Sequence, residues 1–133
     1  YQHQYIEPAL KWLTKYGLHP HMTIMVGYYW ETQEMLDETV KFVEDLMYSG
    51  LARTLQVTLC TPLDFTPYHY ETINKKVILA KDYDEYDMSK IIVKTPIPHE
   101  SYYEAVRKMY SIAYNPKFVR RQVKFLTSMK KRD

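Results

Sequence analysis

Cysteine is almost absent from this sequence, and its scarcity excludes several kinds of site. Cys60 is the only cysteine among 133 residues, so the chain forms no internal disulfide and cannot by itself build a zinc or iron-sulfur site from several cysteines. No apolar run approaches the length of a membrane-spanning helix, and the first residues lack the basic and long apolar regions of a signal peptide. We therefore expect a soluble, cytoplasmic protein in a reducing compartment, with no membrane partner.

A large net charge is also missing, although the charge that is present is unevenly distributed. The formal net charge is +2 and 26% of the residues are charged, which is typical neither of a disordered chain nor of a protein that binds nucleic acid over its whole surface. Residues 117–133 nevertheless carry +6, from one aspartate and seven basic residues: Lys117, Arg120, Arg121, Lys124, Lys130, Lys131 and Arg132. The simplest interpretation is the solvated face of a terminal helix, so nucleic acid is not an expected partner.

The first sixty residues alternate between two patterns. Apolar side chains at helical spacing predict helices over 6–17 and over the segment that ends at Ser49 and Gly50, while short apolar runs predict strands over 21–26 and 53–60. The second strand has one apolar face and one more polar face, the latter formed by Gln56, Thr58 and Cys60. This order favours parallel strands joined by crossover helices, and the polar face suits the interior of a barrel.

The second half of the chain is predicted to contain a loop, short strands and two further helices. A loop with a short helix follows over 61–76, and two short strands over 77–80 and 90–95 would flank an acidic turn. A helix from about His99 carries a stripe of Tyr103, Val106, Met109, Tyr110 and Ala113, and a last helix carries Val119, Val123, Leu126 and Met129. Because Asn115 and Pro116 interrupt the pattern, we predict a body over 1–115 and a basic C-terminal helix over 116–133.

The stretch "MVGYYWET" places Gly27 between the first strand and the following helix. In parallel α/β folds, ligands gather at the carboxyl ends of the strands. A glycine there allows a ligand close to the backbone, and Glu31 could accept hydrogen bonds from an amine or a ribose hydroxyl, or favour the start of the helix. Glycine in a turn is also ordinary turn chemistry.

Two motifs in order carry a resemblance to a known family. Residues 25–32 are similar to a hydrophobic-Gly-x-Pro-Gly-Glu-Thr motif, with Tyr29 and Trp30 in place of Pro-Gly, and residues 61–67 are similar to Thr-Pro-x-Pro-Gly-Thr-Pro, with Asp64 and Phe65 in place of Pro-Gly. Together with "YDEYDM" and "MYSIAYNPKFVRR", they resemble the C-terminal part of radical S-adenosylmethionine (SAM) enzymes, in the branch that often carries an N-terminal cobalamin-binding domain. The likeness spans residues 5–125.

The resemblance implies the C-terminal portion of a partial, TIM-like (β/α) barrel with C-terminal helices, in which the two strands would be the fifth and sixth. It implies that Met25, Gly27 and Glu31 contribute to the SAM site, with Gln56 and Thr58 as neighbours facing the barrel interior. Family members hold a 4Fe-4S cluster on a Cys-x3-Cys-x2-Cys loop, and one cysteine cannot provide it. Those ligands are therefore expected outside this chain, in an upstream half of the same polypeptide, together with a cobalamin domain where the branch carries one.

Several functional consequences are expected. The chain should contain neither catalytic residues nor metal ligands, and should not cleave SAM alone. It would act on an unidentified substrate with the upstream half, as part of an oxidoreductase or methyltransferase, and an exposed barrel edge would allow a homodimer. The alternative is a non-catalytic interaction module whose basic C-terminal helix binds RNA or an acidic partner. We interpret Cys60 as structural, and the His19 and His21 pair as too small a ligand set for a metal.

Overall fold

The computed structural model describes residues 3–129. The elements follow in the order α1 (His3–Lys15), β1 (His21–Val26), α2 (Gln33–Ser49), β2 (Thr54–Leu59), α3 (Pro67–Asn74), η1 (Tyr83–Glu85), α4 (His99–Ser111), η2 (Ile112–Tyr114) and α5 (Pro116–Met129). The helices and strands predicted for the first sixty residues are confirmed, as is the short helix within 61–76. Among the described residues, no helix is long and apolar enough to cross a membrane.

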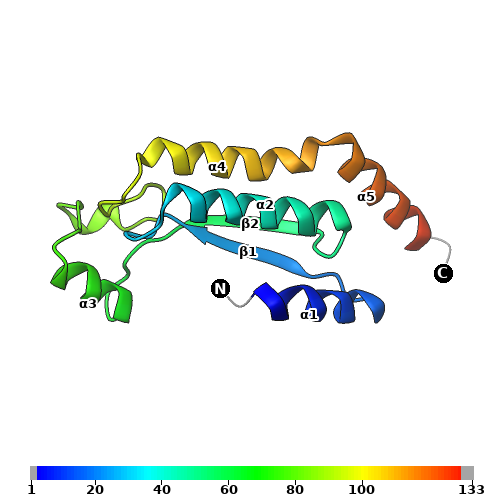
Figure 1. The fold of residues 1–133 in the computed structure, drawn as a ribbon, viewed down its shortest axis with the longest axis horizontal. Helices are drawn as coiled ribbons and strands as arrows, with labels where there is room; N and C mark the ends of the chain where they lie inside the picture. The colour runs from blue at the N-terminus through cyan, green and yellow to red at the C-terminus, as the bar shows by residue number, and fades with distance from the viewer. Residues whose placement is uncertain (1–2, 130–133) are drawn as a thin grey trace.

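The two strands form a parallel sheet in which His21 is level with Thr54 and Val26 with Leu59. Helix α2 links them as a crossover, and α2 and α4 lie over the same face of the sheet (Figure 1). Local chemistry fixes the ends of α2. The Thr32 hydroxyl accepts a hydrogen bond from the Met35 backbone N–H at 3.3 Å, and Gly50 adopts a φ of 80°, which ends the helix in a left-handed conformation.

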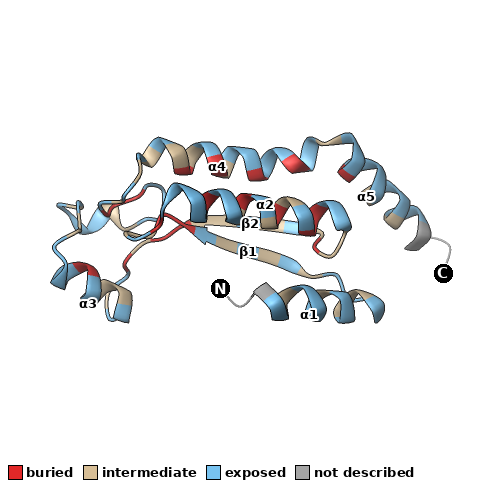
Figure 2. Ribbon diagram, viewed as in Figure 1, coloured by how far each residue is buried: buried red, intermediate tan, exposed pale blue. Residues whose placement is uncertain are grey.

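The core lies between this covered face of the sheet and the two helices above it (Figure 2). Leu36 and Val43 of α2 pack there with Tyr102 and Met109 of α4. The predicted stripe on α4 is confirmed in part: Met109 is buried, and Tyr103 and Val106 are half-buried against the core. The stripe omitted the other buried residues of α4 and the turn after it, which are Tyr102, Ala105 and Ile112. Tyr110 and Ala113 are exposed. Two adjacent tyrosines at 102 and 103 satisfy helical spacing equally well, and only packing against α2 selects the first.

The predicted strands over 77–80 and 90–95 are not formed. The two segments meet in one isolated antiparallel bridge, between Ile78 and Val93. The intervening acidic turn folds on itself instead, since Glu85 accepts hydrogen bonds from the backbone N–H groups of Lys81 and Asp82 and pairs with Lys90 at 2.7 Å. These contacts hold the Glu85 carboxylate within the turn.

Helix α5 uses a different face from the one that its apolar stripe predicts. Phe118 is buried, and Phe125 lies beneath the Arg53 guanidinium, 3.4 Å from its carbon to the ring centroid. The Arg121 guanidinium donates to the Tyr48 carbonyl near the end of α2. With this face packed, the aliphatic stripe of α5 lies at the surface, where Val119, Val123 and Leu126 are exposed. The Met129 side chain and Lys130, Lys131 and Arg132 lie outside the described residues.

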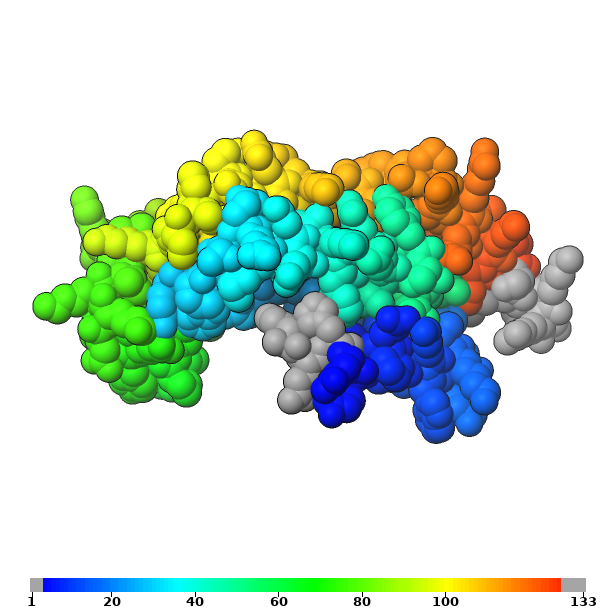
Figure 3. All heavy atoms as spheres, in the orientation of Figure 1, coloured from blue at the N-terminus to red at the C-terminus, as the bar shows by residue number. Residues whose placement is uncertain are grey.

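Helix α1 packs against the lower margin of this body. In the space-filling view it forms a lobe there, while α3 and its neighbouring loops form the left end of the molecule (Figure 3). Ile6 and Leu10 are its half-buried apolar residues toward the core, and Trp12 and Tyr16 are exposed with their ring centroids 4.5 Å apart. The chain is thus a mixed α/β unit with a two-stranded parallel sheet, and a barrel remains a prediction.

Candidate functional site

The loops that leave the carboxyl ends of β1 and β2 lie next to each other, and Gly27 stands at the first of them. Its φ is +93°, a left-handed value that favours glycine. A Cβ added there would lie 3.1 Å from the Ile91 side chain. The glycine therefore allows the strand to turn beneath Ile91, and this close approach within the protein accounts for it without a ligand.

Glu31 closes the loop that Gly27 begins. It is 5% exposed, and its Oε2 accepts hydrogen bonds from the backbone N–H groups of Gly27 at 2.6 Å and Tyr28 at 3.3 Å. The Glu31 backbone carbonyl accepts a further bond from the Tyr102 hydroxyl at 3.0 Å. Burial raises the pKa of the carboxyl, and the two backbone donors partly oppose that shift. Glu31 thus holds the loop in shape and ties it to α4.

Four aromatic rings cluster where the two loops meet. Tyr28 and Trp30 stack with centroids 4.9 Å apart, and Tyr29 meets Trp30 edge-on at 4.7 Å. Tyr68, at the start of α3, lies edge-on to Trp30 at 5.6 Å, and its hydroxyl accepts from the Tyr29 backbone N–H. Trp30 remains 41% exposed. The cluster therefore presents an aromatic surface to solvent at the strand ends.

Three ionisable side chains in and beside this cluster, Cys60, Tyr68 and Tyr29, have raised pKa values. Burial raises the pKa of the Cys60 thiol to about 11, and it raises the pKa of the neighbouring Tyr68 hydroxyl as well. The Tyr29 hydroxyl donates to Glu71 at 2.5 Å, and this hydrogen bond raises its pKa to about 12. All three groups are therefore protonated at neutral pH. Cys60 is 3% exposed, in agreement with its structural interpretation.

The three remaining predicted residues lie on the face of the sheet that α2 and α4 leave open. Met25 is level with Thr58, and Thr23 with Gln56. Side chains that are level on parallel strands point to the same face. Met25 is 41% exposed, Gln56 is exposed, and the Thr58 hydroxyl donates to the Ile24 carbonyl at 3.4 Å. The structure therefore brings Met25, Gln56 and Thr58 together on one accessible surface.

The described part of the chain offers no metal centre. It contains no group of three histidine, cysteine, aspartate or glutamate side chains that could hold an ion. The two histidines before and within β1 have other partners: His19 accepts from the Arg53 Nε at 3.0 Å, and the His21 Nδ1 lies 2.7 Å from the Thr54 hydroxyl. An iron-sulfur cluster therefore does not fit on these residues.

Sequence reasoning missed several residues that shape this region. Tyr68 follows a proline in a segment whose pattern predicts only a loop and a short helix, and Tyr102 was hidden by the neighbouring Tyr103. Arg53 was included only in a strand, although its guanidinium contacts α5. Helical spacing connects Tyr102, Ala105 and Met109 just as well as Tyr103, Val106 and Tyr110. It therefore does not select the buried face of α4, and no sequence pattern predicts the contacts of Tyr68 or Arg53.

No protein-family model, curated protein or solved structure matches the chain. Function is therefore inferred from the geometry of the chain itself and from the resemblance of its motifs.

Proposed function

We propose that this chain supplies two neighbouring strands of a SAM-binding barrel in a radical SAM enzyme. The observation that carries the proposal is the open face of the β1–β2 sheet, where Met25, Gln56 and Thr58 lie together. Parallel strands whose two faces are both covered usually have continuously apolar sequences. In β1 and β2, by contrast, apolar residues that face the core alternate with more polar residues at the surface. An alternating parallel pair fits the interior of a barrel that holds a polar ligand.

Each residue has a distinct part in this proposal. Gln56 offers an amide that can donate and accept hydrogen bonds, Thr58 offers a hydroxyl, and Met25 offers an apolar, polarisable surface. Gly27 and Glu31 act indirectly, by fixing the loop that carries Trp30. The exposed Trp30 ring is placed to stack on a flat heterocycle such as adenine.

The reductive chemistry of the family comes from its 4Fe-4S cluster, which supplies the electron that cleaves SAM. The described residues offer no ligand set for it, so in this proposal the cluster belongs to an upstream half of the same polypeptide. That half would also carry the cobalamin domain if the protein belongs to the corresponding branch. The part of this chain is to bind and orient SAM, and the substrate is unidentified.

The test is SAM binding by the natural polypeptide that contains this chain, measured by isothermal titration calorimetry under anaerobic conditions. Gln56→Ala should weaken binding by about tenfold, which corresponds to about 1.4 kcal/mol. Gln33→Ala is the matched control, since Gln33 is also exposed but begins α2 and hydrogen-bonds only to Asp37 in the described structure. Unchanged affinity in the Gln56 variant, or equal losses in both variants, would contradict the proposal.

The second candidate function is an interaction module, and the exposure of basic residues on α5 favours it. Lys117, Arg120 and Lys124 are exposed, but Arg121 holds the end of α2. Charge removal at Arg120 and Lys124 should abolish salt-sensitive RNA binding if the module exists. Arg121→Met serves as the control, because it should lower the melting temperature instead. RNA binding that is absent, or independent of salt, argues against the module.

A further inference from the structure

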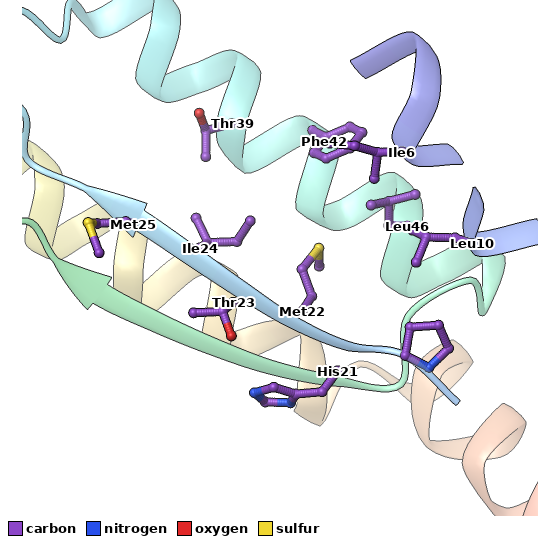
Figure 4. Close-up of a pocket in the computed structure, with 11 residues that line it drawn as sticks. Ile6, Leu10, His21, Met22, Thr23, Ile24, Met25, Thr39, Phe42 and Leu46 are labelled. Carbon is purple, nitrogen blue, oxygen red and sulfur yellow. The ribbon is translucent and has the colours of Figure 1, made fainter. Parts of the chain in front are cut away.

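Two arginines lie near each other at the end of the sheet opposite the candidate SAM site. Arg53 directly precedes β2, and Arg121 belongs to α5. Helix α5 lies beside the start of β1, the end of the strand at which Figure 4 labels His21. There the His19 and Phe125 rings meet edge-on with centroids 4.3 Å apart. The two arginines are therefore at the amino ends of the strands, whereas the residues proposed to bind SAM lie toward the carboxyl ends.

Arg53 is held in place from three directions. Its Nε donates to the His19 Nδ1 at 3.0 Å, and a terminal guanidinium nitrogen donates to the Gln122 Oε1 at 3.3 Å. The Gln122 side-chain nitrogen donates in return to the Arg53 carbonyl at 3.3 Å. The Arg53 backbone N–H donates to the Pro20 carbonyl at 3.2 Å. The guanidinium is thus fixed between the start of the sheet and α5.

Arg121 is held by the end of α2. Gly50 ends that helix, and a Cβ added to Gly50 would lie 3.0 Å from the Arg121 Cδ and 3.1 Å from its Nε. The arginine therefore occupies the space that a side chain at position 50 would need. Its guanidinium donates to the Tyr48 carbonyl, where the negative end of the helix dipole favours a cation. The fold thus gives Arg121, like Arg53, a defined position.

The two guanidiniums carry charges that no acid balances. The Phe125 ring beneath Arg53 belongs to the residue one helical turn after Arg121, so both cations lie on the same side of α5. The ion pairs of the described residues include neither arginine, and the described sequence of α5 contains no acidic residue. Burial lowers the pKa of Arg53, and the nearby charge of Arg121 lowers it further. Two like charges fixed side by side favour the binding of an anion.

The hydrogen-bond donors that remain fit a phosphate group. A guanidinium presents a planar fork of N–H donors that matches phosphate oxygens. Arg53 uses part of its fork for His19 and Gln122, and Arg121 uses part of its fork for the Tyr48 carbonyl. The other N–H groups of both forks have no partner among the described residues. A tetrahedral dianion can accept from both forks at once and neutralise both charges.

We propose that Arg53 and Arg121 form a binding site for the phosphate group of a small ligand at the amino ends of β1 and β2. The site is separate from the proposed SAM site and does not depend on it. His19 supplies a reporter, because burial and the charge of Arg53 lower the pKa of its ring. An anion bound to Arg53 offsets that charge, so binding should raise the pKa of His19.

Isothermal titration calorimetry with inorganic phosphate, on the natural polypeptide that contains this chain, tests the site. Arg53→Met and Arg121→Met should each weaken binding by about tenfold or more, because each removes charge-assisted hydrogen bonds. Arg120→Met is the matched control and should change affinity less than about twofold, since Arg120 is exposed on α5 and has no hydrogen bond or ion pair in the described structure. No phosphate binding by the parent protein, or equal losses in all three variants, would overturn the proposal.

A conservative variant guards against loss of the fold. Arg121→Lys keeps the charge and can still donate to the Tyr48 carbonyl, but it lacks the fork. With a circular dichroism spectrum like that of the parent protein, this variant should still bind phosphate about fivefold more weakly. Full affinity in the folded lysine variant would overturn the proposal. Methyl phosphate, titrated in parallel, distinguishes a phosphate monoester from free phosphate as the source of the group.

Proton uptake locates the bound anion. Sulfate is a tetrahedral dianion that does not titrate near neutral pH, so its binding at about pH 6 should be accompanied by proton uptake at His19. Calorimetry in buffers of different ionisation enthalpy measures this uptake, and His19→Gln should bind sulfate without it. Sulfate binding without proton uptake in the parent protein would place the anion away from Arg53 and overturn the proposal.

A single-stranded RNA oligonucleotide separates the phosphate site from the second candidate function. That function predicts RNA binding that depends on Arg120 and not on Arg121, which is the reverse of the pattern expected for phosphate. RNA that displaces phosphate and loses affinity in both Arg53→Met and Arg121→Met would assign the two arginines to a polynucleotide and overturn the small-ligand site.

Discussion

Two replacements of Glu31 distinguish the effect of its hydrogen bonds on stability from the effect of its charge. Glu31→Ala removes the acceptor from two backbone N–H groups, of which that of Gly27 is buried and bonded at 2.6 Å. A buried donor left without a partner costs about 1–3 kcal/mol. With the partly buried Tyr28 N–H included, we expect the free energy of unfolding to fall by about 2–4 kcal/mol. Glu31→Gln keeps an acceptor oxygen and should cost less than about 1 kcal/mol.

The two variants should also differ from the parent protein in their pH dependence. Burial raises the pKa of Glu31 in the folded protein above its value of 4.5 in the unfolded chain. The folded state therefore binds more protons between these two pKa values. The stabilising contribution is complete below the unfolded pKa and is lost as pH rises through the folded pKa, with a slope of at most about 1.4 kcal/mol per pH unit.

Urea unfolding at a series of pH values provides the assay, with the difference between the parent protein and Glu31→Gln as the measured quantity. This difference cancels the opposite contribution of Glu85, whose pKa is lowered by its hydrogen bond with Lys90. We expect the parent protein to lose stability relative to the Gln variant as pH rises above 4.5. Parallel curves, or an Ala variant as stable as the Gln variant, would refute the reasoning.

Two further predictions concern the same loop region. Gly27→Ala should lower the free energy of unfolding by about 1–3 kcal/mol, because it combines a strained φ with a contact to Ile91; urea unfolding measures it, and an unchanged midpoint would show that the loop adapts freely. Cys60 in the folded protein should react with a thiol reagent at pH 8 about 100-fold more slowly than an unfolded thiol, because its pKa is about 11 rather than 9.0. Mass spectrometry measures the labelling, which denaturant should accelerate, and rapid labelling of the folded chain would contradict the buried position.

Local patterns predicted the elements that local chemistry determines. Strand β1 and helix α2 were predictable because Gly27, Thr32 and Gly50 act on their immediate neighbours, through left-handed φ values and a capping hydroxyl. The alternation of β2 predicted that Gln56 and Thr58 share one face. The register that sets Met25 level with Thr58 is a property of the folded sheet, because a shift by two residues would keep the same faces.

Long-range choices were not predictable from the same patterns. Tyr102 rather than Tyr103 is fully buried because it is the one that packs against α2. The packed face of α5 is the one that contacts Arg53 and carries the Arg121 hydrogen bond. An apolar stripe along a helix identifies a candidate buried face. Contacts of an arginine with an aromatic ring or with carbonyl groups at a helix end can cause a different face of the helix to pack against the protein. The partners of Glu31 were also not predictable from the sequence. A carboxylate in a loop can accept hydrogen bonds from a ligand or from the backbone of the loop, and the buried position of Glu31 gives it the backbone partners.

The stacking of Trp30 in the aromatic cluster makes the loop an optical reporter. Indole emission depends on the polarity and quenchers around the ring, and Trp30 is in contact with Tyr28 while still partly open to solvent. The only other tryptophan is Trp12, which is 65% exposed on the distant helix α1. With Trp12 changed to phenylalanine, the tryptophan fluorescence of the protein, excited at wavelengths that its fourteen tyrosines do not absorb, would come from the candidate site alone. Ligand binding and loop opening could then be followed there without an added dye.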